Sequence, residues 1–258
     1  MDWATKRKLL FIAGFFGIIF LIIGLVYLLR YYQAPTCTDL KQNQGEQGVD
    51  CGGPCTIVCS SQISDPVVFW QRSFESTHGM YNAVAYVENP NSDLGVEEAV
   101  YRFKLYDAQN IYITERIGKT FIAPNERFAI FEPRLPVGER LPKRTVFEFV
   151  KFSSWKKVEG EKPTLFVRGE QITGETEKPK ATATLENKLL IPINNIDVSA
   201  IIYDTDDNAI AASATLVDSI LPESSFDVVF TWQQPFRAPP VRIEVIPRIN
   251  PFVTITPL

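Results

Sequence analysis

Histidine is almost absent from this 258-residue sequence, which contains a single one, His78. The sequence also lacks a G-x-S-x-G turn, an H-E-x-x-H helix, a glycine-rich phosphate loop and a pair of carboxylates in a setting that would separate their pKa values. An isolated loop histidine is normally just solvated. These absences argue against catalysis, so we expect no enzyme activity, no catalytic residue and no cofactor.

Positive charge is scarce after residue 30, where 22 Lys plus Arg stand against 29 Asp plus Glu, a net charge of −7. No basic run occurs in this part of the chain. Nucleic acids and other anionic polymers are bound through clustered Lys and Arg side chains. The charge pattern therefore excludes nucleic acid from the expected partners.

Long hydrophobic runs are missing except for one, Leu9 to Leu29, which contains no charged residue. At ~1.5 Å per helical residue, this run is long enough to cross a hydrocarbon layer of ~30 Å. A cleaved signal peptide would have a shorter apolar region and small residues at a cleavage site, whereas Arg30, Tyr31 and Tyr32 follow here. A helix buried in a soluble core would have a polar face. The run predicts an uncleaved transmembrane helix over 9–29.

The charges beside this run predict its orientation. Lys6, Arg7 and Lys8 precede it, and Arg30 alone follows it immediately. The positive-inside rule places the N-terminus in the cytoplasm, and the tyrosines at 27, 31 and 32 suit the outer interface. We therefore expect a single-pass protein of the cytoplasmic membrane, with a cytoplasmic tail over 1–8 and the domains after residue 30 outside the cytoplasm.

Cysteine is absent after residue 59, and all four cysteines lie within 37–59. The segment between them has too few apolar groups to form a core without crosslinks. Four thiolates can also bind zinc, but the spacing C-x13-C-x3-C-x3-C lacks paired C-x2-C knuckles. The oxidising side of a membrane favours disulfides. We predict a disulfide-stapled spacer over 30–61, with three connectivities open, formed by Cys37, Cys51, Cys55 and Cys59.

The same segment contains acidic residues among glycines. The series C-x-D, then N-x-x-E-x-G-V-D-C-G-G-x-C, starting at Cys37, resembles a short motif of bacterial surface and secreted proteins. Asp39, Glu46 and Asp50, with Asn43, offer oxygen atoms that calcium could use. The ordered D-x-[DN]-x-[DN]-G spacing of a calcium loop is missing, and Asp and Asn also initiate turns. We predict turn chemistry here, with calcium as the alternative.

From residue 66 onward the sequence aligns with itself at a shift of 97 to 98. Landmarks recur in the same order, and they predict two copies of one domain over 62–161 and 162–258. The four pairs are Pro66-Val67-Val68-Phe69 with Pro163-Thr164-Leu165-Phe166, Val87-Glu88-Asn89 with Leu185-Glu186-Asn187, Leu105-Tyr106-Asp107 with Ile202-Tyr203-Asp204, and Pro124-x-x-x-Phe128 with Pro222-x-x-x-Phe226.

Each copy has the pattern of short strands. Tyr101, Phe103 and Leu105 alternate with Arg102 and Lys104, which is typical of a strand with one buried face. Turn signals recur every 8 to 12 residues, so the fold class is all-β, two tandem immunoglobulin-like β-sandwiches.

The stretch Phe103-x-Leu105-Tyr106-Asp107 resembles the FxLYD domain, a relative of the late-embryogenesis-abundant type 2 sandwich. The second copy departs from it, with Ala200 in place of the phenylalanine. The resemblance implies an immunoglobulin-like fold and a surface location. It implies no catalytic residue.

Two functional hypotheses follow. In the first, the sandwiches form a structural or interaction protein of the cell envelope, whose partners are the membrane and other envelope or membrane proteins. In the second, they form a sensor that binds a small ligand or calcium. The expected cytoplasmic tail is too short for a signalling domain, which favours the first.

Trp70, Trp155 and Trp232 are candidate partner anchors, although tryptophan is equally common in cores.

The charge asymmetry around the apolar run makes the topology testable. Single cysteines introduced after residue 60 should react with a membrane-impermeant thiol reagent in intact cells. A cysteine in the N-terminal tail should react only after permeabilisation. Protection of the later sites in intact cells would reverse the predicted orientation.

Overall fold

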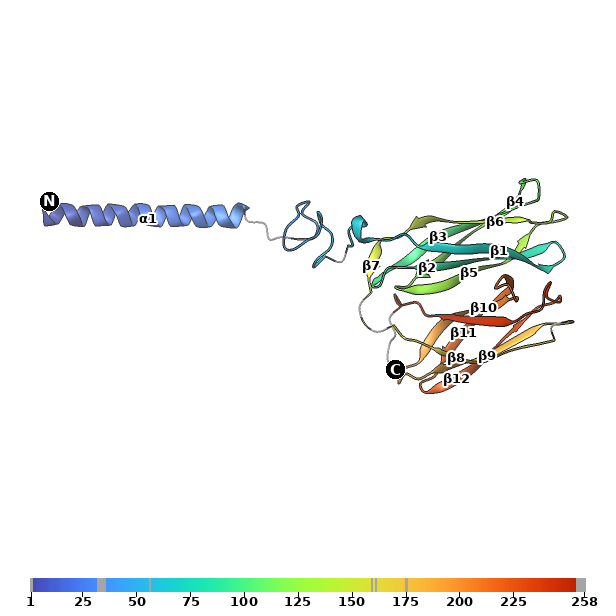
Figure 1. Ribbon diagram of the computed structural model, residues 1–258. Helices are drawn as coiled ribbons and strands as arrows, with labels where there is room; N and C mark the ends of the chain where they lie inside the picture. Colours follow the sequence, from blue (N-terminus) through green and yellow to red (C-terminus); the bar gives the residue numbers. More distant parts are fainter. Residues whose placement is uncertain are drawn as a thin grey trace. The chain divides into compact units, whose positions relative to one another are not determined.

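The computed structural model describes residues 2–31, 36–55, 57–158, 160, 162–174 and 176–253 (Figure 1). Its contacts divide the chain into two compact units, Met1–Cys55 and Thr56–Leu258, and each is described by itself. Tyr32 and the side chain of Tyr31, two of the predicted interfacial tyrosines, lie outside the described residues.

Helix α1 runs from Trp3 to Tyr31, so it begins six residues earlier than the predicted span. Lys6, Arg7 and Lys8 are good helix formers and continue the backbone hydrogen bonding beyond the apolar run. The predicted tail over 1–8 is therefore mostly helical. In α1, Trp3–Leu28 is long and apolar enough to cross a membrane, a composition that a signal sequence can share.

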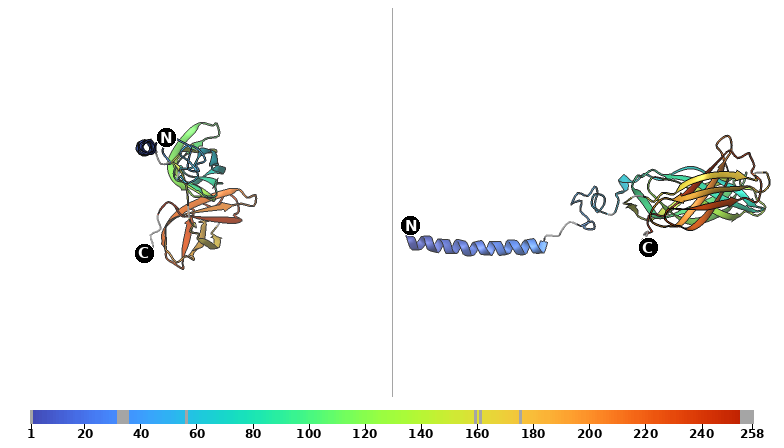
Figure 2. Two further views of the ribbon diagram at one scale, coloured as in Figure 1. Left: turned by 90° about the vertical axis from the view of Figure 1, so that its left-hand side faces the viewer. Right: turned by 90° about the horizontal axis from the view of Figure 1, so that it is seen from below.

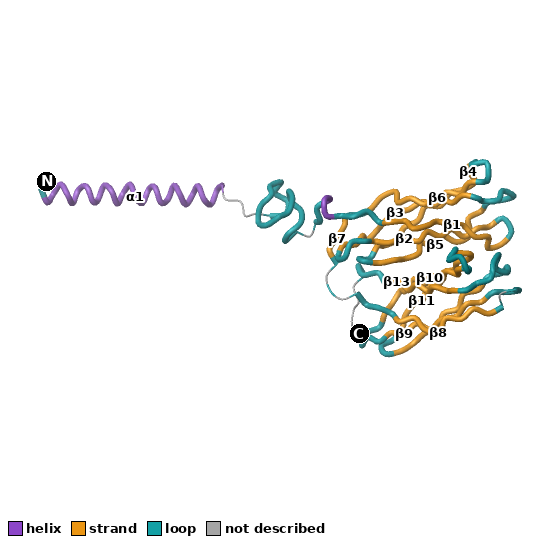
Figure 3. Tube along the Cα trace, in the orientation of Figure 1, coloured by secondary structure: helices purple, strands orange, loops and turns teal. Residues whose placement is uncertain are grey.

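In the second unit, strands account for most of the described residues (Figure 3), which confirms the predicted all-β fold. Sandwich 1, as named here, consists of the sheet β1-β2-β5 and the sheet β4-β3-β6, whose β3 also pairs with the short β7. Its strands are β1 (Val67–Thr77), β2 (Met80–Asn89), β3 (Leu94–Tyr106), β4 (Tyr112–Ile122), β5 (Glu126–Pro136), β6 (Arg144–Phe152) and β7 (Trp155–Lys157).

Sandwich 2 consists of the sheet β8-β9-β12 and the sheet β11-β10-β13. Apart from β7, its strands occur in the order of those in sandwich 1. They are β8 (Phe166–Thr173), β9 (Lys180–Asn187), β10 (Ile193–Tyr203), β11 (Ala209–Ile220), β12 (Ser224–Thr231) and β13 (Arg242–Arg248).

The two sandwiches share local contacts as well as strand order. Asn89 ends β2 and donates its side-chain amide to the carbonyls of Leu94 and Ala123, both at 2.8 Å. Asn187 ends β9 and donates likewise to the carbonyls of Ile191 and Ile220, at 2.8 and 3.1 Å. In each case one buried amide ties the end of its strand to the loops of the facing sheet.

The turns after β3 and β10 match in the same way. The Asp107 carboxylate accepts the backbone N–H groups of residues 109 and 111, and the Asp204 carboxylate accepts those of residues 206 and 208. Asn110 and Asp207 both have positive φ, 62° and 59°. The D-x-D-x-N series at residue 204 therefore forms a turn.

Apolar side chains fill three layers between the four sheets, which lie one upon another (Figures 1 and 2). One cluster is the core of sandwich 1 and one is the core of sandwich 2. The third cluster lies between the sandwiches, with Val84 and Ala129 on one side and Ile201 and Ala212 on the other. A sheet from each sandwich therefore has apolar residues on both faces.

Phe103 lies in the core of sandwich 1 with no solvent exposure, whereas Phe166 at the start of β8 is 45% exposed. Phe103→Asp should unfold sandwich 1, since an unpaired buried charge costs several kcal/mol against a domain stability of ~5 to 15 kcal/mol. The matched change Phe166→Asp should leave the fold intact. Thermal unfolding followed by circular dichroism separates the two, and a native melting curve for Phe103→Asp would contradict the assigned core.

Candidate functional site

The cysteine-rich segment forms the disulfides that the sequence predicts. Cys37 and Cys55 are bonded to each other, with their Cα atoms 5.6 Å apart, and Cys51 and Cys59 are also disulfide-bonded. The sulfur atoms of Cys37 and Cys55 lie within 4.8 Å of the Glu46 carboxylate, an arrangement that would suit a metal if they were thiolates. As disulfide sulfurs they are not available as thiolate ligands, which favours the disulfide interpretation over zinc.

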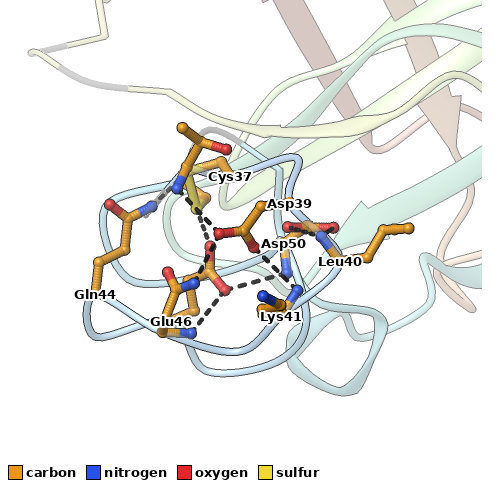
Figure 4. The surroundings of a disulfide bond; sticks show 10 residues. Cys37, Asp39, Leu40, Lys41, Gln44, Glu46 and Asp50 are labelled. Carbon is orange, nitrogen blue, oxygen red and sulfur yellow. Dashed lines mark hydrogen bonds between the residues drawn. A yellow bond between two sulfur atoms is a disulfide. The ribbon is translucent and has the colours of Figure 1, made fainter. Parts of the chain in front are cut away.

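The acidic side chains of this segment accept hydrogen bonds from backbone N–H groups (Figure 4). Asp50 accepts the N–H of Leu40 on both carboxylate oxygens, at 3.1 and 2.9 Å. Asp39 accepts the N–H of Lys41 at 3.0 Å and the side-chain amide of Asn43 at 2.8 Å. This amide hydrogen bond is the main cause of the lowered pKa of the exposed Asp39 carboxyl.

Glu46 is the buried member of the group, with 6% of its surface exposed. Its Oε2 accepts the N–H of Asn43 at 3.3 Å and the N–H of Asp50 at 3.2 Å. The three predicted calcium candidates thus lie close together, and each holds a turn of the backbone. The geometry favours the turn interpretation of Asp39, Glu46 and Asp50.

A second region, which the sequence reasoning missed, lies between the sandwiches. Trp70 and Tyr86 stack with ring centroids 5.6 Å apart on the outer face of β1-β2-β5. They pack against the apolar cluster that contains Ile201 and Ala209 of sandwich 2. Trp70 therefore packs inside the second unit and is not an exposed partner anchor.

Two tyrosines and one carboxylate link the sandwiches across this cluster. Tyr86 of β2 donates to Glu244 Oε1 at 2.6 Å, and Tyr203 of β10 donates to Glu244 Oε2 at 3.0 Å. The Arg242 guanidinium lies over the Tyr203 ring and 3.5 Å from the same carboxylate. Burial and the neighbouring Glu244 carboxylate raise the pKa of the Tyr86 and Tyr203 hydroxyls above the ordinary value of tyrosine. Both hydroxyls therefore remain hydrogen-bond donors at neutral pH.

Arg248 at the end of β13 is the second polar link, with 4% of its surface exposed. Its guanidinium donates to the Phe121 carbonyl at 2.7 Å and to Thr120 Oγ1 at 3.0 Å, both in sandwich 1. It also lies 3.4 Å from Oε2 of Glu126, which is 6% exposed. The ring of Phe128 packs against the guanidinium, with the Arg248 Cζ 4.1 Å from its centroid. A buried cation of sandwich 2 is thus held by sandwich 1.

One edge of this interface opens into a cleft of about 470 Å³. Side chains from both sandwiches line it, among them Phe74, Arg134 and Trp232. The Trp232 indole N–H donates to the Ala212 carbonyl at 3.2 Å, so this tryptophan fastens a loop to strand β11. Trp155 packs against Phe152 beside the core of sandwich 1, with ring centroids 5.8 Å apart. A small molecule in this cleft would contact both sandwiches.

One sequence signal could have indicated this interface. Val198 to Tyr203 reads V-S-A-I-I-Y, so apolar residues occupy both faces of the strand. A strand buried on both sides has such a pattern. The partners of Arg248 lie more than 120 positions away in the chain, and no local pattern identifies them.

Comparison with known proteins identifies no family. No protein-family model and no curated protein matches the chain. A crystal structure of red sea bream transglutaminase is similar over 73% of this chain and 30% of its own chain, at 11% sequence identity and a TM-score of 0.24. A similarity this weak is no argument for a shared fold or activity.

Arg248→Met tests the buried link. The change removes a buried guanidinium that donates to the Phe121 carbonyl and to Thr120, and it leaves Glu126 with Lys162, 3.5 Å away, as its remaining cation. It should lower the free energy of unfolding by about 1.5 to 3 kcal/mol, the loss expected for hydrogen bonds that involve a charged group. Glu126→Gln in the same chain should recover little of the loss, because Lys162 still balances the Glu126 carboxylate. Arg168→Met removes an exposed arginine that pairs with Glu186 and should cost less than about 1 kcal/mol. Urea unfolding measures the free energy of unfolding of all three variants. Equal losses of this free energy for Arg248→Met and Arg168→Met would contradict the assigned link.

Proposed function

We propose that this chain is a non-enzymatic, membrane-anchored protein of the cell envelope, whose two sandwiches act as one rigid body that presents a contact surface to other proteins. Helix α1 is the proposed anchor, with the cluster at Lys6 to Lys8 on the cytoplasmic side. Residues 30–61 are proposed to form a spacer outside the cytoplasmic membrane, because disulfides are stable in an oxidising compartment and stiffen a short segment.

The observation that carries the proposal is the filled interface between the sandwiches. An apolar cluster, the bridge from Tyr86 through Glu244 to Tyr203 and the buried Arg248 join the two bodies. A sensor that closes on a ligand needs an interface that opens at low cost, whereas these contacts must be broken together. Rigid display of a surface fits the arrangement better than hinge closure does.

The sandwiches are further proposed to be two copies of one FxLYD-like domain. Their common strand order supports this, as do the matching asparagines at 89 and 187 and the matching aspartate turns at 107 and 204. A fold of this kind is used for many purposes, so the proposed role depends on the interface and not on the resemblance.

The cleft lined by Phe74, Arg134 and Trp232 favours a second candidate, a small-ligand sensor. It has the size of a ligand pocket and takes side chains from both sandwiches. It lies at the edge of the interface, so a ligand could enter without separating the sandwiches.

Co-purification from membranes in mild detergent, quantified by mass spectrometry, tests the two candidates. The wild-type chain should retain a reproducible set of proteins, and Arg248→Met should retain at least about threefold less because the rigid body is loosened. Arg168→Met is the matched control and should retain the full set. If nothing is retained and a small metabolite instead raises the melting temperature in proportion to its concentration, the sensor candidate replaces the proposal.

A further inference from the structure

The cleft at the edge of the interface is open because its two walls differ in side-chain size. On the side of β1-β2-β5 the wall is aromatic and includes Phe74 and Phe131. On the side of β11 the wall is formed by small residues, among them Ala212 and Ala214, which lie two positions apart on one face of the strand. The alanine methyl groups leave both rings only partly buried. The remaining volume of about 470 Å³ is that of a typical ligand pocket.

The segment 232–237, which follows β12 and is here named the strap, forms the third wall of the cleft. The Trp232 indole N–H fixes its first residue to the Ala212 carbonyl, and the Phe236 ring packs edge-on against Trp232, with the centroids 5.2 Å apart. Prolines at 235, 239 and 240 have no N–H group to donate to a sheet. The segment therefore stays outside both sheets of sandwich 2 and adds two more aromatic rings to the cleft.

The charges of the cleft leave one cation in excess. Of the described residues that line it, three are charged, namely Glu75, Arg134 and Arg237. Arg237 of the strap lies 3.2 Å from the Glu75 carboxylate, so these two neutralise each other. None of the ion pairs formed by the described residues includes Arg134. The Arg134 guanidinium is therefore the positive charge that a ligand would meet.

A β-bulge places Arg134 beside the cleft. Tyr81 pairs with Leu135 and Ala83 with Glu132, so two residues of β5 stand opposite Asn82 of β2. Arg134 is the second of these two, and its φ of 55° is uncommon for a residue with a side chain. Its backbone N–H donates to Asn82 Oδ1 at 3.0 Å, which holds this conformation. Bulges of this kind redirect a side chain and are frequent next to functional sites.

We infer that this cleft binds a small aromatic carboxylate, with the carboxylate on Arg134 and the aromatic ring between Phe74 and Trp232. A guanidinium donates two parallel hydrogen bonds to a carboxylate, and aromatic rings pack favourably edge-on or offset against one another. One unpaired cation matches a ligand with a single negative charge. The inference goes beyond the proposed function and does not depend on it, because a ligand at the edge of the interface leaves the two sandwiches in contact.

The ring and the charge of the ligand make separate contributions to binding. An aromatic ligand displaces water from the partly buried rings of the cleft, which favours any ligand with an apolar ring. The Arg134 guanidinium distinguishes a carboxylate from a neutral amide, since only the carboxylate forms charge-assisted hydrogen bonds. Because Arg134 is exposed, water and salt reduce this gain. We therefore expect modest affinity, with a preference of about tenfold for the carboxylate.

N-acetylphenylalanine and its neutral amide test the inference, because they differ only at the carboxyl group. Isothermal titration calorimetry of the full chain in detergent, with protein-free micelles as the blank, should show binding of the carboxylate and about tenfold weaker binding of the amide. Arg134→Gln should lower the affinity for the carboxylate to that for the amide. Arg168→Gln, which changes an exposed arginine that pairs with Glu186 in sandwich 2, is the matched control and should bind as the wild type does.

A second variant locates the ligand. Ala214 is exposed on the wall of the cleft, so Ala214→Trp should fill the cleft without disturbing either core, and it should abolish binding of both compounds. Melting curves show that each variant is folded. The inference is overturned if N-acetylphenylalanine does not bind at millimolar concentration, if the amide binds equally well, or if either cleft variant binds like the wild type. Retention of membrane proteins is measured without these compounds, so its outcome tests the proposed function separately.

Discussion

The burial of one outer sheet face on another is the constraint on which the second unit depends. The outer face of β1-β2-β5 presents Trp70, Phe74 and Tyr86, a set that would be an exposed apolar patch in an isolated sandwich. The outer face of β11-β10-β13 covers it with Ile201 and small alanines, which let the two sheets approach closely. Each sandwich thus supplies a surface that the other needs.

Most buried polar groups at this contact have partners; Arg248 Nε is the exception among the groups named here. Glu244 receives hydrogen bonds from Tyr86 and Tyr203, and Arg248 donates to a carbonyl and a hydroxyl of sandwich 1. Burying such groups without partners costs more than the hydrogen bonds return, so their geometry fixes how the sandwiches meet. The apolar cluster supplies the stability of the contact, and the polar links supply its register.

The same fold carries different surface chemistry at counterpart positions, and this difference decides what each face can bind. Ile201 faces another sheet inside the molecule, while Lys104 occupies the matching position on an outer layer. Asp227 stands where Ala129 stands in the first sandwich. Functional interpretation of the chain therefore rests on the outward rows of the strands, since the inward rows form an apolar core in both sandwiches.

Local patterns in the sequence were enough to predict the long helix, the clustered disulfides and the alternation of strands such as Tyr101 to Leu105. Each of these features depends on residues that are near one another in the chain. The helix depends on an uncharged run, the disulfides on closely spaced cysteines, and the strands on a period of two. The start of α1 at Trp3 was not predicted, because helical hydrogen bonds continue past the apolar run into a basic stretch that hydropathy alone excludes. The pairing of Cys37 with Cys55 and the contact of Arg248 with Phe121 and Glu126 were decided by the tertiary structure, since folding brings together groups whose separation in the sequence carries no record of their distance in space.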